Sequence, residues 1–224
     1  MRAMILAAGR GERLRPLTDT CPKPLIAVGG KPLIVWHIEK LKAAGIDEIV
    51  VNSAWLSEKI VAFLGDGSAF GVHIMHSVEG PGGLETAGGI IKALPLLGDE
   101  PFVVVNGDTF MDADYRQFMQ VEITPACLGC LFLVPNPPHH LQGDFSLQAS
   151  SAIIRGGAYT FSGAALYRKE AFAALSVERL PLRPLFDQWI AHGQLCGRML
   201  QGKWFDVGTR ERLEQTAAYL QAQA

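Results

Sequence analysis

The sequence lacks any strong excess of charge of one sign. Among its 224 residues, 20 are Lys or Arg and 22 are Asp or Glu, so the formal net charge is only −2. A protein that binds nucleic acid or an anionic membrane surface through its charge would carry a clear basic excess. The sequence therefore predicts neither nucleic acid nor a membrane as a partner, and the basic residues that gather near the N-terminus are a local feature.

Long hydrophobic runs are also missing. No stretch approaches the roughly 18 apolar residues of a membrane-spanning helix. The opening MRAMILAAG contains an apolar run that is too short for a secretory signal and ends at Gly9 and Arg10. We therefore expect a cytoplasmic protein. Its length fits a single domain over residues 1–224, and we expect a monomer.

Cysteine is scarce, with only Cys21, Cys127, Cys130 and Cys196. The motif CLGC has the spacing of a redox or metal-binding pair, but the chain has no second pair. It also lies within ACLGCLFLV (126–134), which is typical of a strand, where positions three apart face opposite sides. We expect a structural role for this pair and treat the other two cysteines as isolated. The count fits a reducing compartment.

Short apolar runs alternate with amphipathic segments in the first half of the chain, a pattern typical of a parallel sheet covered by helices. The expected strands are 2–8, 47–53, 71–77 and 101–108, and the expected helices are 32–45, 56–65 and 84–97. Later segments predict strands at 126–134, 143–149, 158–168 and 194–200, a helix at 182–193, and a short strand with a closing helix from 204. We therefore predict an α/β fold with a Rossmann-like, open, mixed and mostly parallel sheet, flanked by helices and carrying a β-rich insertion. No hexapeptide repeat indicates a C-terminal β-helix.

A glycine-rich, basic loop follows the first expected strand. The stretch LAAGRGERLRPLTDTCPKPL (6–25) holds Gly9, Gly11, Arg13 and Lys23 among its residues. In an open α/β sheet this loop lies at the carboxyl ends of the strands, where ligands bind. Its glycines allow amide N–H groups to surround an anion, although the spacing fits neither a P-loop nor a complete dinucleotide fingerprint. The loop thus indicates phosphate binding, and a solvated turn explains it equally well.

Two acidic residues stand at the ends of apolar segments. Asp108 follows VVVNG, and Asp206 lies in WFDVG. Each acid taken alone is equally well explained as a turn former. Beside a phosphate-binding loop, however, the two together suggest a magnesium site, because Mg²⁺ typically takes one or two carboxylates together with substrate phosphates and water.

These motifs resemble those of a known family. LAAGRGERLRPLTDTCPKPLIAVGGKPLI (6–34) resembles the signature of the sugar-1-phosphate nucleotidyltransferases, and VVNGD (104–108) and WFDVGT (204–209) resemble their two metal-binding segments. The motifs occur in family order and extend over essentially the whole chain. The resemblance implies an enzyme that takes a nucleoside triphosphate, UTP, and a sugar 1-phosphate as its substrates, with Mg²⁺ as cofactor, and that binds its sugar in the β-rich insertion.

The resemblance also implies a role for individual residues. The nucleotide would contact Leu6, Ala8, Gly9, Gly11, Glu12, Arg13, Lys23 and Gly83. Arg13 and Lys23 would also act in catalysis, by stabilising charge on the transition state. Gly88 and Gly89 would permit a close approach of the base. The remaining implied contacts are Asn106 for the sugar or the ribose, Asp144 for the sugar, and Asp108 and Asp206 for the metal.

Within the family, segments 79–99 and 136–147 and the short C-terminal part indicate a narrower group. They resemble uridylyltransferases of bacterial cell-wall recycling that make UDP-N-acetylmuramate from N-acetylmuramate 1-phosphate. A sugar of the glucose or mannose type, or another nucleotide, is the alternative within the class. A catalytically silent regulator that binds sugar nucleotides is the alternative from a different class. Arg13, Lys23, Asp108 and Asp206 are all present, which argues against silence, because a degenerate site would be expected to have lost at least one of them.

Overall fold

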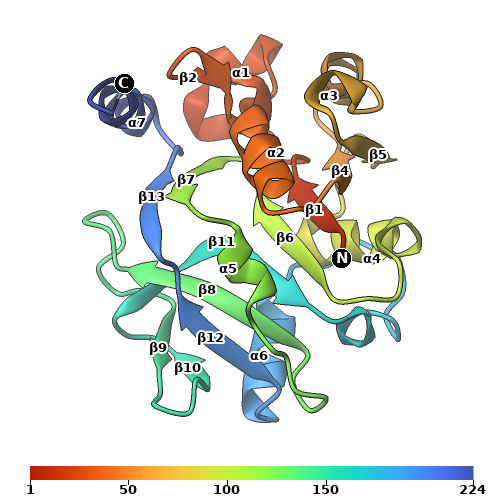
Figure 1. Ribbon diagram of the computed structural model, residues 1–224, viewed down its shortest axis with the longest axis vertical. Helices are drawn as coiled ribbons and strands as arrows, with labels where there is room; N and C mark the ends of the chain where they lie inside the picture. Colours follow the sequence, from red (N-terminus) through yellow and green to blue (C-terminus); the bar gives the residue numbers. More distant parts are fainter. Residues whose placement is uncertain (224) are drawn as a thin grey trace.

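The computed structural model describes residues 1–223 and has one mixed sheet of nine strands at its centre (Figure 1). Its first half is parallel, in the order β5, β4, β1 and β6. Strand β11 runs antiparallel to β6 and pairs with β8 and β9, and these two pair in turn with β12 and β10. The bounds are β1 Ala3–Leu6, β4 Glu48–Ser53, β5 His73–Val78, β6 Phe102–Asn106, β8 Gly129–Pro135, β9 Phe145–Leu147, β10 Ile153–Arg155, β11 Tyr159–Tyr167 and β12 Leu195–Met199.

Helices flank this sheet, so the predicted α/β fold with a mostly parallel first half is confirmed (Figure 1). The bounds are α1 Leu17–Thr20, α2 Leu33–Ala43, α3 Ser57–Leu64, α4 Glu85–Leu97, α5 Arg116–Met119, α6 Arg183–Ala191 and α7 Arg210–Gln221. Two small ribbons complete the described chain, β2 (Ala27–Val28) with β3 (Lys31–Pro32) and β7 (Thr109–Ala113) with β13 (Gly202–Asp206).

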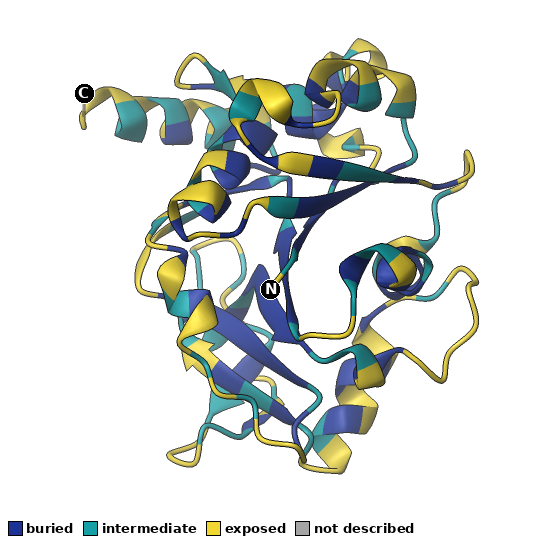
Figure 2. Cartoon of the chain, turned by 45° about the vertical axis from the view of Figure 1, so that its right-hand side comes forward, coloured by how far each residue is buried: buried dark blue, intermediate teal, exposed yellow. Residues whose placement is uncertain are grey.

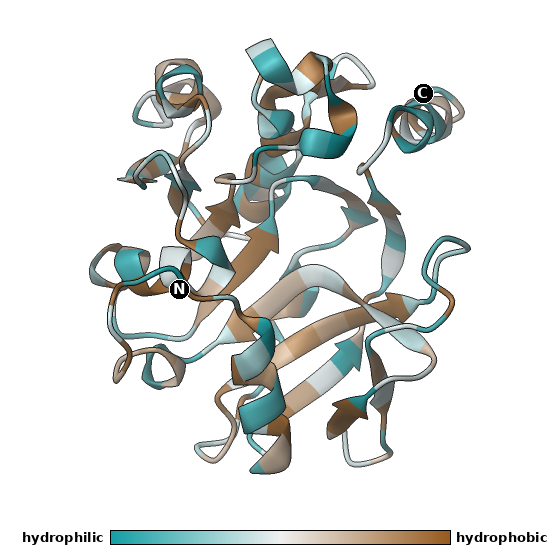
Figure 3. Cartoon of the chain, turned by 180° about the vertical axis from the view of Figure 1, so that it is seen from behind, coloured by the Kyte–Doolittle hydropathy of each residue, from teal (hydrophilic) through white to brown (hydrophobic). Residues whose placement is uncertain are grey.

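The alternation of side chains along β1 explains why helices lie on both faces. Ile5 belongs to a core cluster that includes Ile38 of α2, whereas Met4, its neighbour, belongs to a second cluster that includes Ile90 of α4. Successive side chains of a strand point to opposite faces, so one apolar run supplies both cores. The strands are accordingly buried in Figure 2 and mostly hydrophobic in Figure 3, while α7 is largely hydrophilic.

The ribbon of β7 and β13 was not predicted, and it determines where Asp206 lies. The two strands are antiparallel, and Asp206 at the end of β13 is paired with Thr109 at the start of β7. Thr109 directly follows Asp108. The ribbon therefore brings two carboxylates that are about a hundred residues apart in the sequence to one edge of the main sheet.

The two glycines inside α4 have a packing role that differs from the one expected. A Cβ on Gly88 would lie 2.1 Å from the carbonyl oxygen of Glu178, and Gly88 N–H donates to the carbonyl of Leu180. A Cβ on Gly89 would lie 2.6 Å from Oε1 of Glu79. The glycines thus permit close approach of protein segments, and the expectation that they make room for a base is not what the packing requires.

One part of the cysteine interpretation is wrong, because Cys196 is not isolated. The thiols of Cys127 and Cys196 donate to one carbonyl oxygen, that of Gly129, at 3.1 and 3.5 Å, and Cys127 precedes strand β8 instead of lying within it. Contact with the Cys196 thiol, together with burial, raises the pKa of Cys127, so this thiol stays protonated and unreactive. All four cysteines are free. Within residues 1–223, no helix has the length and apolar character to cross a bilayer.

Candidate active site

The loop after β1 exposes backbone N–H groups at the edge of the sheet. Gly11 has φ +66°, and a Cβ there would lie 2.8 Å from Cγ2 of Thr18 and 3.1 Å from Cβ of Lys23, so only glycine lets the loop pack this closely. The hydroxyl of Thr18 donates to the Gly11 carbonyl at 2.9 Å and holds the turn. Among residues 1–223, no acceptor is found for the amides of Gly9, Arg10 and Gly11. They remain available to bind an anion.

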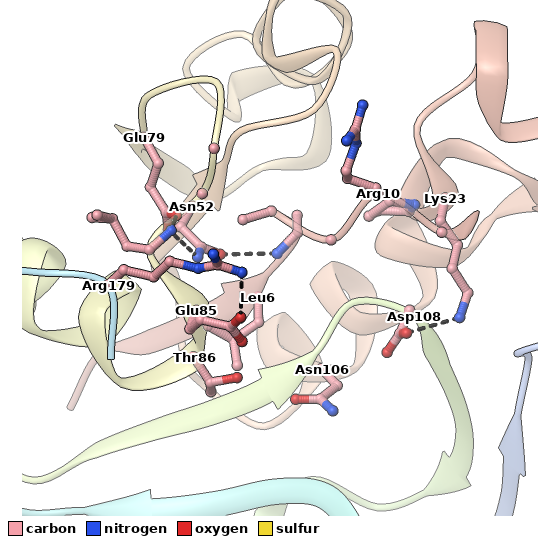
Figure 4. Close-up of a pocket in the computed structure, with 18 residues that line it drawn as sticks. Leu6, Arg10, Lys23, Asn52, Glu79, Glu85, Thr86, Asn106, Asp108 and Arg179 are labelled. Atoms are coloured by element: carbon pink, nitrogen blue, oxygen red, sulfur yellow. Dashed lines mark hydrogen bonds and ion pairs between the residues drawn. The ribbon is translucent and has the colours of Figure 1, made fainter. Parts of the chain in front are cut away.

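A buried polar network fixes this loop to the segment after β5. Oδ1 of Asn52, at the end of β4, accepts from Ala7 N–H at 2.9 Å, and its Nδ2 donates to Oε1 of Glu79 at 2.7 Å (Figure 4). The other oxygen of Glu79 accepts from Leu84 N–H at 2.7 Å. Asn52 and Glu79 are buried and fully paired, so the network orients both loops. Sequence reasoning missed Asn52, although a polar residue that ends an apolar strand was a usable signal.

A cavity of about 340 Å³, called here the first cavity, lies between these two loops (Figure 4). An ion pair of 2.9 Å between Arg179 and Glu85 lies at its wall, and Arg179 was not predicted. Six of the predicted nucleotide-binding residues line this cavity: Leu6, Ala8, Gly9, Gly11, Lys23 and Gly83. The other two, Glu12 and Arg13, line a neighbouring third cavity of about 280 Å³ together with Lys23, Asp108 and Gly208. The structure therefore brings the predicted set together around connected hollows.

Lys23 points from the loop toward the first acidic residue. It lies in a short 3₁₀ turn between Pro22 and Pro24, its side chain is only 5% exposed, and its Nζ donates to Oδ2 of Asp108 at 2.8 Å (Figure 4). Burial of a lysine is costly unless a carboxylate pairs with it, which Asp108 does here. The two prolines restrict the backbone on both sides and so hold the direction of the side chain.

The second acidic residue, Asp206, is paired with a cation from the C-terminal helix. Nη1 of Arg212 contacts Oδ2 of Asp206, and Nε2 of His139 lies 3.4 Å from the same oxygen. The side chains of Asp206 and Arg212 are 21% and 16% exposed. The two predicted metal carboxylates thus lie on one wall, and each is bonded to a basic group. Neither Arg212 nor His139 was predicted as a site residue.

A second cavity, of about 390 Å³, opens on the side of β11 and contains both carboxylates in its lining. Asn106 and Asp108 line both this cavity and the first one, so the two hollows meet there. A bulge in β11 forms part of the wall, because Gly163, with φ +84°, lets the strand approach Asn106 where a Cβ would lie 2.7 Å from its Nδ2. The predicted substrate contact Asn106 is therefore at the junction of the two cavities.

Asp144, the other predicted substrate contact, lies behind the lining of the second cavity. Its Oδ2 accepts from Phe161 N–H at 2.9 Å, and its Oδ1 is 3.2 Å from Nε2 of His140. His140 and Phe161 both line the cavity, whereas Asp144 does not appear among its lining residues. Any influence of Asp144 on a ligand there would include the positions of these two residues.

A buried histidine holds the ribbon that carries the acidic residues. Nε2 of His37 on α2 lies 2.8 Å from the carbonyl of Thr109, and its Nδ1 lies 2.7 Å from the hydroxyl of Tyr115. A carbonyl only accepts, so Nε2 carries the proton and Nδ1 accepts from the tyrosine. Burial lowers the pKa of His37 from 6.5 to about 4. The ring is therefore neutral, and it fixes the residue next to Asp108.

This pKa predicts how stability depends on pH. In the window from pH 6.5 to about 4 the unfolded chain binds a proton at His37 and the folded chain does not, so the free energy of unfolding falls as pH falls. The full difference corresponds to about 3 kcal/mol. Glutamine does not titrate in this range, so between pH 7 and 4 the free energy of unfolding of His37→Gln should fall by about 3 kcal/mol less than that of the parent chain. Denaturant unfolding at several pH values measures it; the exposed His73→Gln is the matched control, and equal slopes for all three proteins would contradict the assignment.

Comparison with known proteins assigns the class to which this fold and site belong. The nucleotidyl transferase family model matches residues 2–223. The chain is 51% identical to an N-acetylmuramate alpha-1-phosphate uridylyltransferase of Neisseria meningitidis serogroup B, over 97% of both chains. It is 32% identical to a mannose-1-phosphate guanyltransferase of Hypocrea jecorina, over 98% of this chain but only 64% of that longer protein.

A solved structure shares the fold over nearly its full length. A putative glucose-1-phosphate thymidylyltransferase from Bacillus anthracis superposes with a TM-score of 0.87 at 25% identity, covering 98% of this chain and 95% of that one. The two hollows that meet beside a glycine-rich loop are those of an α/β enzyme that joins two substrates. The chain belongs to the nucleotidyl transferase family, and the family resemblance stated from its motifs is confirmed.

Proposed function

We propose that the protein transfers UMP from UTP to N-acetylmuramate 1-phosphate, forming UDP-N-acetylmuramate and pyrophosphate. The observation that carries the proposal is the junction of two cavities at Asn106 and Asp108, because a transfer reaction needs two substrates that meet at one point. The choice of substrates follows the name of the 51% identical Neisseria relative. We further propose that the enzyme acts as a cytoplasmic monomer.

The nucleotide would occupy the first and third cavities. Free amides of the loop Gly9–Gly11 and the side chains of Arg13 and Lys23 are suited to the triphosphate, since amide nests and cations bind phosphate oxygens. The base would lie against the segment around Gly83, on the wall that Asn52 and Glu79 hold in place. The sugar phosphate would enter the second cavity from the side of β11.

The donor set beside the junction fits a magnesium ion that the substrates complete. Asp108 and Asp206 both line the second cavity, and no group of three His, Cys, Asp or Glu residues suited to a metal exists within residues 1–223. Two carboxylates alone are too few to form a closed metal site from protein ligands. Together with substrate phosphates and water they form a donor set typical of Mg²⁺. Asp108 and Asp206 would hold the ion, which would supply neutralisation of phosphate charge.

The residues of this chain would act mainly by position and charge. An oxygen of the sugar phosphate attacks the α-phosphorus of UTP in line; that O–P bond forms while the bond from the α-phosphorus to the bridging oxygen breaks, and pyrophosphate leaves with the electron pair. Lys23 and Arg13 would stabilise the charge that grows on the leaving group. No protein nucleophile is required, since positioning and charge stabilisation carry most of the catalysis in such transfers.

Pyrophosphate release across a matrix of nucleotides and sugar 1-phosphates tests the proposal. UTP with N-acetylmuramate 1-phosphate should give the highest kcat/KM. Preference for GTP with mannose 1-phosphate would favour the activity named for the Hypocrea relative, and preference for glucose 1-phosphate would overturn the sugar while leaving the transfer reaction in place. Tight binding of a sugar nucleotide without any turnover would indicate a regulatory binding protein instead.

Asp144 should affect the sugar substrate more than the nucleotide. We expect Asp144→Ala to raise the KM for N-acetylmuramate 1-phosphate by roughly 10- to 150-fold, with a much smaller change for UTP, because it removes the charged acceptor that holds Phe161 and His140 on the wall of the second cavity. Asp144→Asn keeps an acceptor for Phe161 N–H, so its KM for the sugar phosphate should lie between those of the parent chain and of Asp144→Ala. Steady-state kinetics with each substrate varied in turn gives both KM values. Equal and small effects on both would show that Asp144 only stabilises a turn.

A further inference from the structure

Each carboxylate of the proposed metal site is paired with a basic side chain, Lys23 on Asp108 and Arg212 on Asp206. Lys23 pairs with Asp108 and can instead form an ion pair with the triphosphate when the nucleotide is bound. Arg212 pairs with Asp206, yet it lines none of the three cavities that the site comprises. The side chain of Arg212 is only 16% exposed, so its pairing with Asp206 carries a desolvation cost. A functional role for the pair would explain why this cost is tolerated.

Arg212 is tethered so that only the end of its side chain is free to move. Its backbone N–H and its Nε both donate to Oγ1 of Thr209, the residue that caps α7, at 3.3 and 3.2 Å. Its Nη1 contacts both Oδ2 of Asp206 and Nε2 of His139, the latter at 2.9 Å. His139 lines the second cavity. The guanidinium therefore lies between a metal carboxylate and the wall of the sugar cavity.

A divalent cation and the guanidinium of Arg212 would both be drawn to the carboxylate of Asp206, whose Oδ2 Arg212 already contacts. A divalent cation held by Asp206 would repel the positive charge of Arg212 and weaken its bond to this carboxylate. The tether at Thr209 and the contact with His139 keep it beside the second cavity. Arg212 is then a desolvated cation that needs a new anion.

Position separates Arg212 from the other arginine of the site. The two guanidinium groups lie on either side of Gly208, where a Cβ would be 2.9 Å from Nη2 of Arg13 and 2.9 Å from Nη2 of Arg212. Arg13 lines both the second and the third cavity, whereas Arg212 lines neither and contacts His139 on the wall of the second. Arg13 can therefore contact either substrate, whereas Arg212 lies beside the second cavity alone, behind His139.

We propose that Arg212 is the residue that selects the sugar: it neutralises Asp206 before the metal binds, and once the metal displaces it, it receives the lactyl carboxylate of N-acetylmuramate 1-phosphate. The planar fork of arginine matches a carboxylate, with two parallel hydrogen bonds. The inference rests on the proposed function, because only a sugar with an acidic substituent supplies that carboxylate. Under this proposal, binding of the metal at Asp206 releases Arg212, and the released Arg212 selects the sugar.

The first arm of the test measures metal binding without substrates. We expect Arg212→Gln to bind Mn²⁺ about tenfold more tightly than the parent chain in calorimetric titration, since the competing cation is gone. Arg210→Gln is the matched control, because Arg210 is exposed on the same helix and forms no hydrogen bond or ion pair within residues 1–223. Its Mn²⁺ affinity should stay within about twofold of the parent. Unchanged affinity in Arg212→Gln overturns the competition.

The second arm compares two sugars that differ only in the lactyl group. Arg212→Gln should lower kcat/KM for N-acetylmuramate 1-phosphate by about 10- to 100-fold, and for N-acetylglucosamine 1-phosphate by less than about threefold. Arg212→Lys keeps the charge but lacks the planar fork, so its loss of kcat/KM for N-acetylmuramate 1-phosphate should be intermediate. This variant replaces Arg212→Gln in the test if the glutamine variant does not fold. Equal losses with both sugars would place Arg212 on the phosphate and overturn the assignment. A parent chain that does not prefer the muramate substrate would refute the proposed function instead.

Discussion

Replacing Asp108 or Asp206 by asparagine should lower turnover by several orders of magnitude while the chain stays folded. The substitution preserves shape and removes the charge on which we propose the metal is held. Asparagine keeps an acceptor oxygen for the Nζ of Lys23 and for the Nη1 of Arg212, so each of these largely buried cations retains a hydrogen-bond partner. Pyrophosphate release at saturating Mg²⁺ measures turnover, and thermal unfolding verifies the fold.

The matched control for these variants is Asp112→Asn. Asp112 lies on the same ribbon, on β7, but its carboxylate pairs with Tyr219 and Lys40 away from the cavities. It should keep turnover close to that of the parent chain. A folded Asp108→Asn or Asp206→Asn variant with turnover near that of the parent would remove that residue from the proposed metal site.

Lys23→Met should reduce kcat by roughly 100-fold or more, with a smaller effect on the affinity for UTP. Methionine keeps the length of the side chain and removes the charge, which we expect to matter most as pyrophosphate departs. The exposed Lys203→Met is the control, since it removes a lysine from β13 without touching the cavities. Steady-state kcat together with a direct measurement of UTP binding separates the two effects. Weaker binding with unchanged kcat at saturation would make Lys23 a binding residue only.

Local chemistry made much of the fold and part of the site predictable. The apolar run of β6 and the alternation with helices such as α2 gave the parallel half of the sheet, because burial on both faces leaves a continuous apolar pattern. The loop was recognisable at Gly11, where a positive φ and close packing against Thr18 and Lys23 demand glycine.

The features that escaped prediction depend on pairing between distant segments. Strand β7 is short, and only its pairing with β13 about ninety residues later makes it a strand and sets Asp206 beside Thr109. The position of Arg212 likewise depends on the helix that follows this ribbon. A single sequence carries no signal for such long-range register, since many pairings satisfy the same apolar pattern.

The most direct test of the central claim is identification of the product made from UTP and N-acetylmuramate 1-phosphate with Mg²⁺. Chromatography with mass detection should find UDP-N-acetylmuramate and pyrophosphate in equal amounts, both absent when Asp108→Asn replaces the parent chain. Absence of UDP-N-acetylmuramate from reactions of the folded parent chain, with UTP and the sugar phosphate recovered unchanged, would contradict the account.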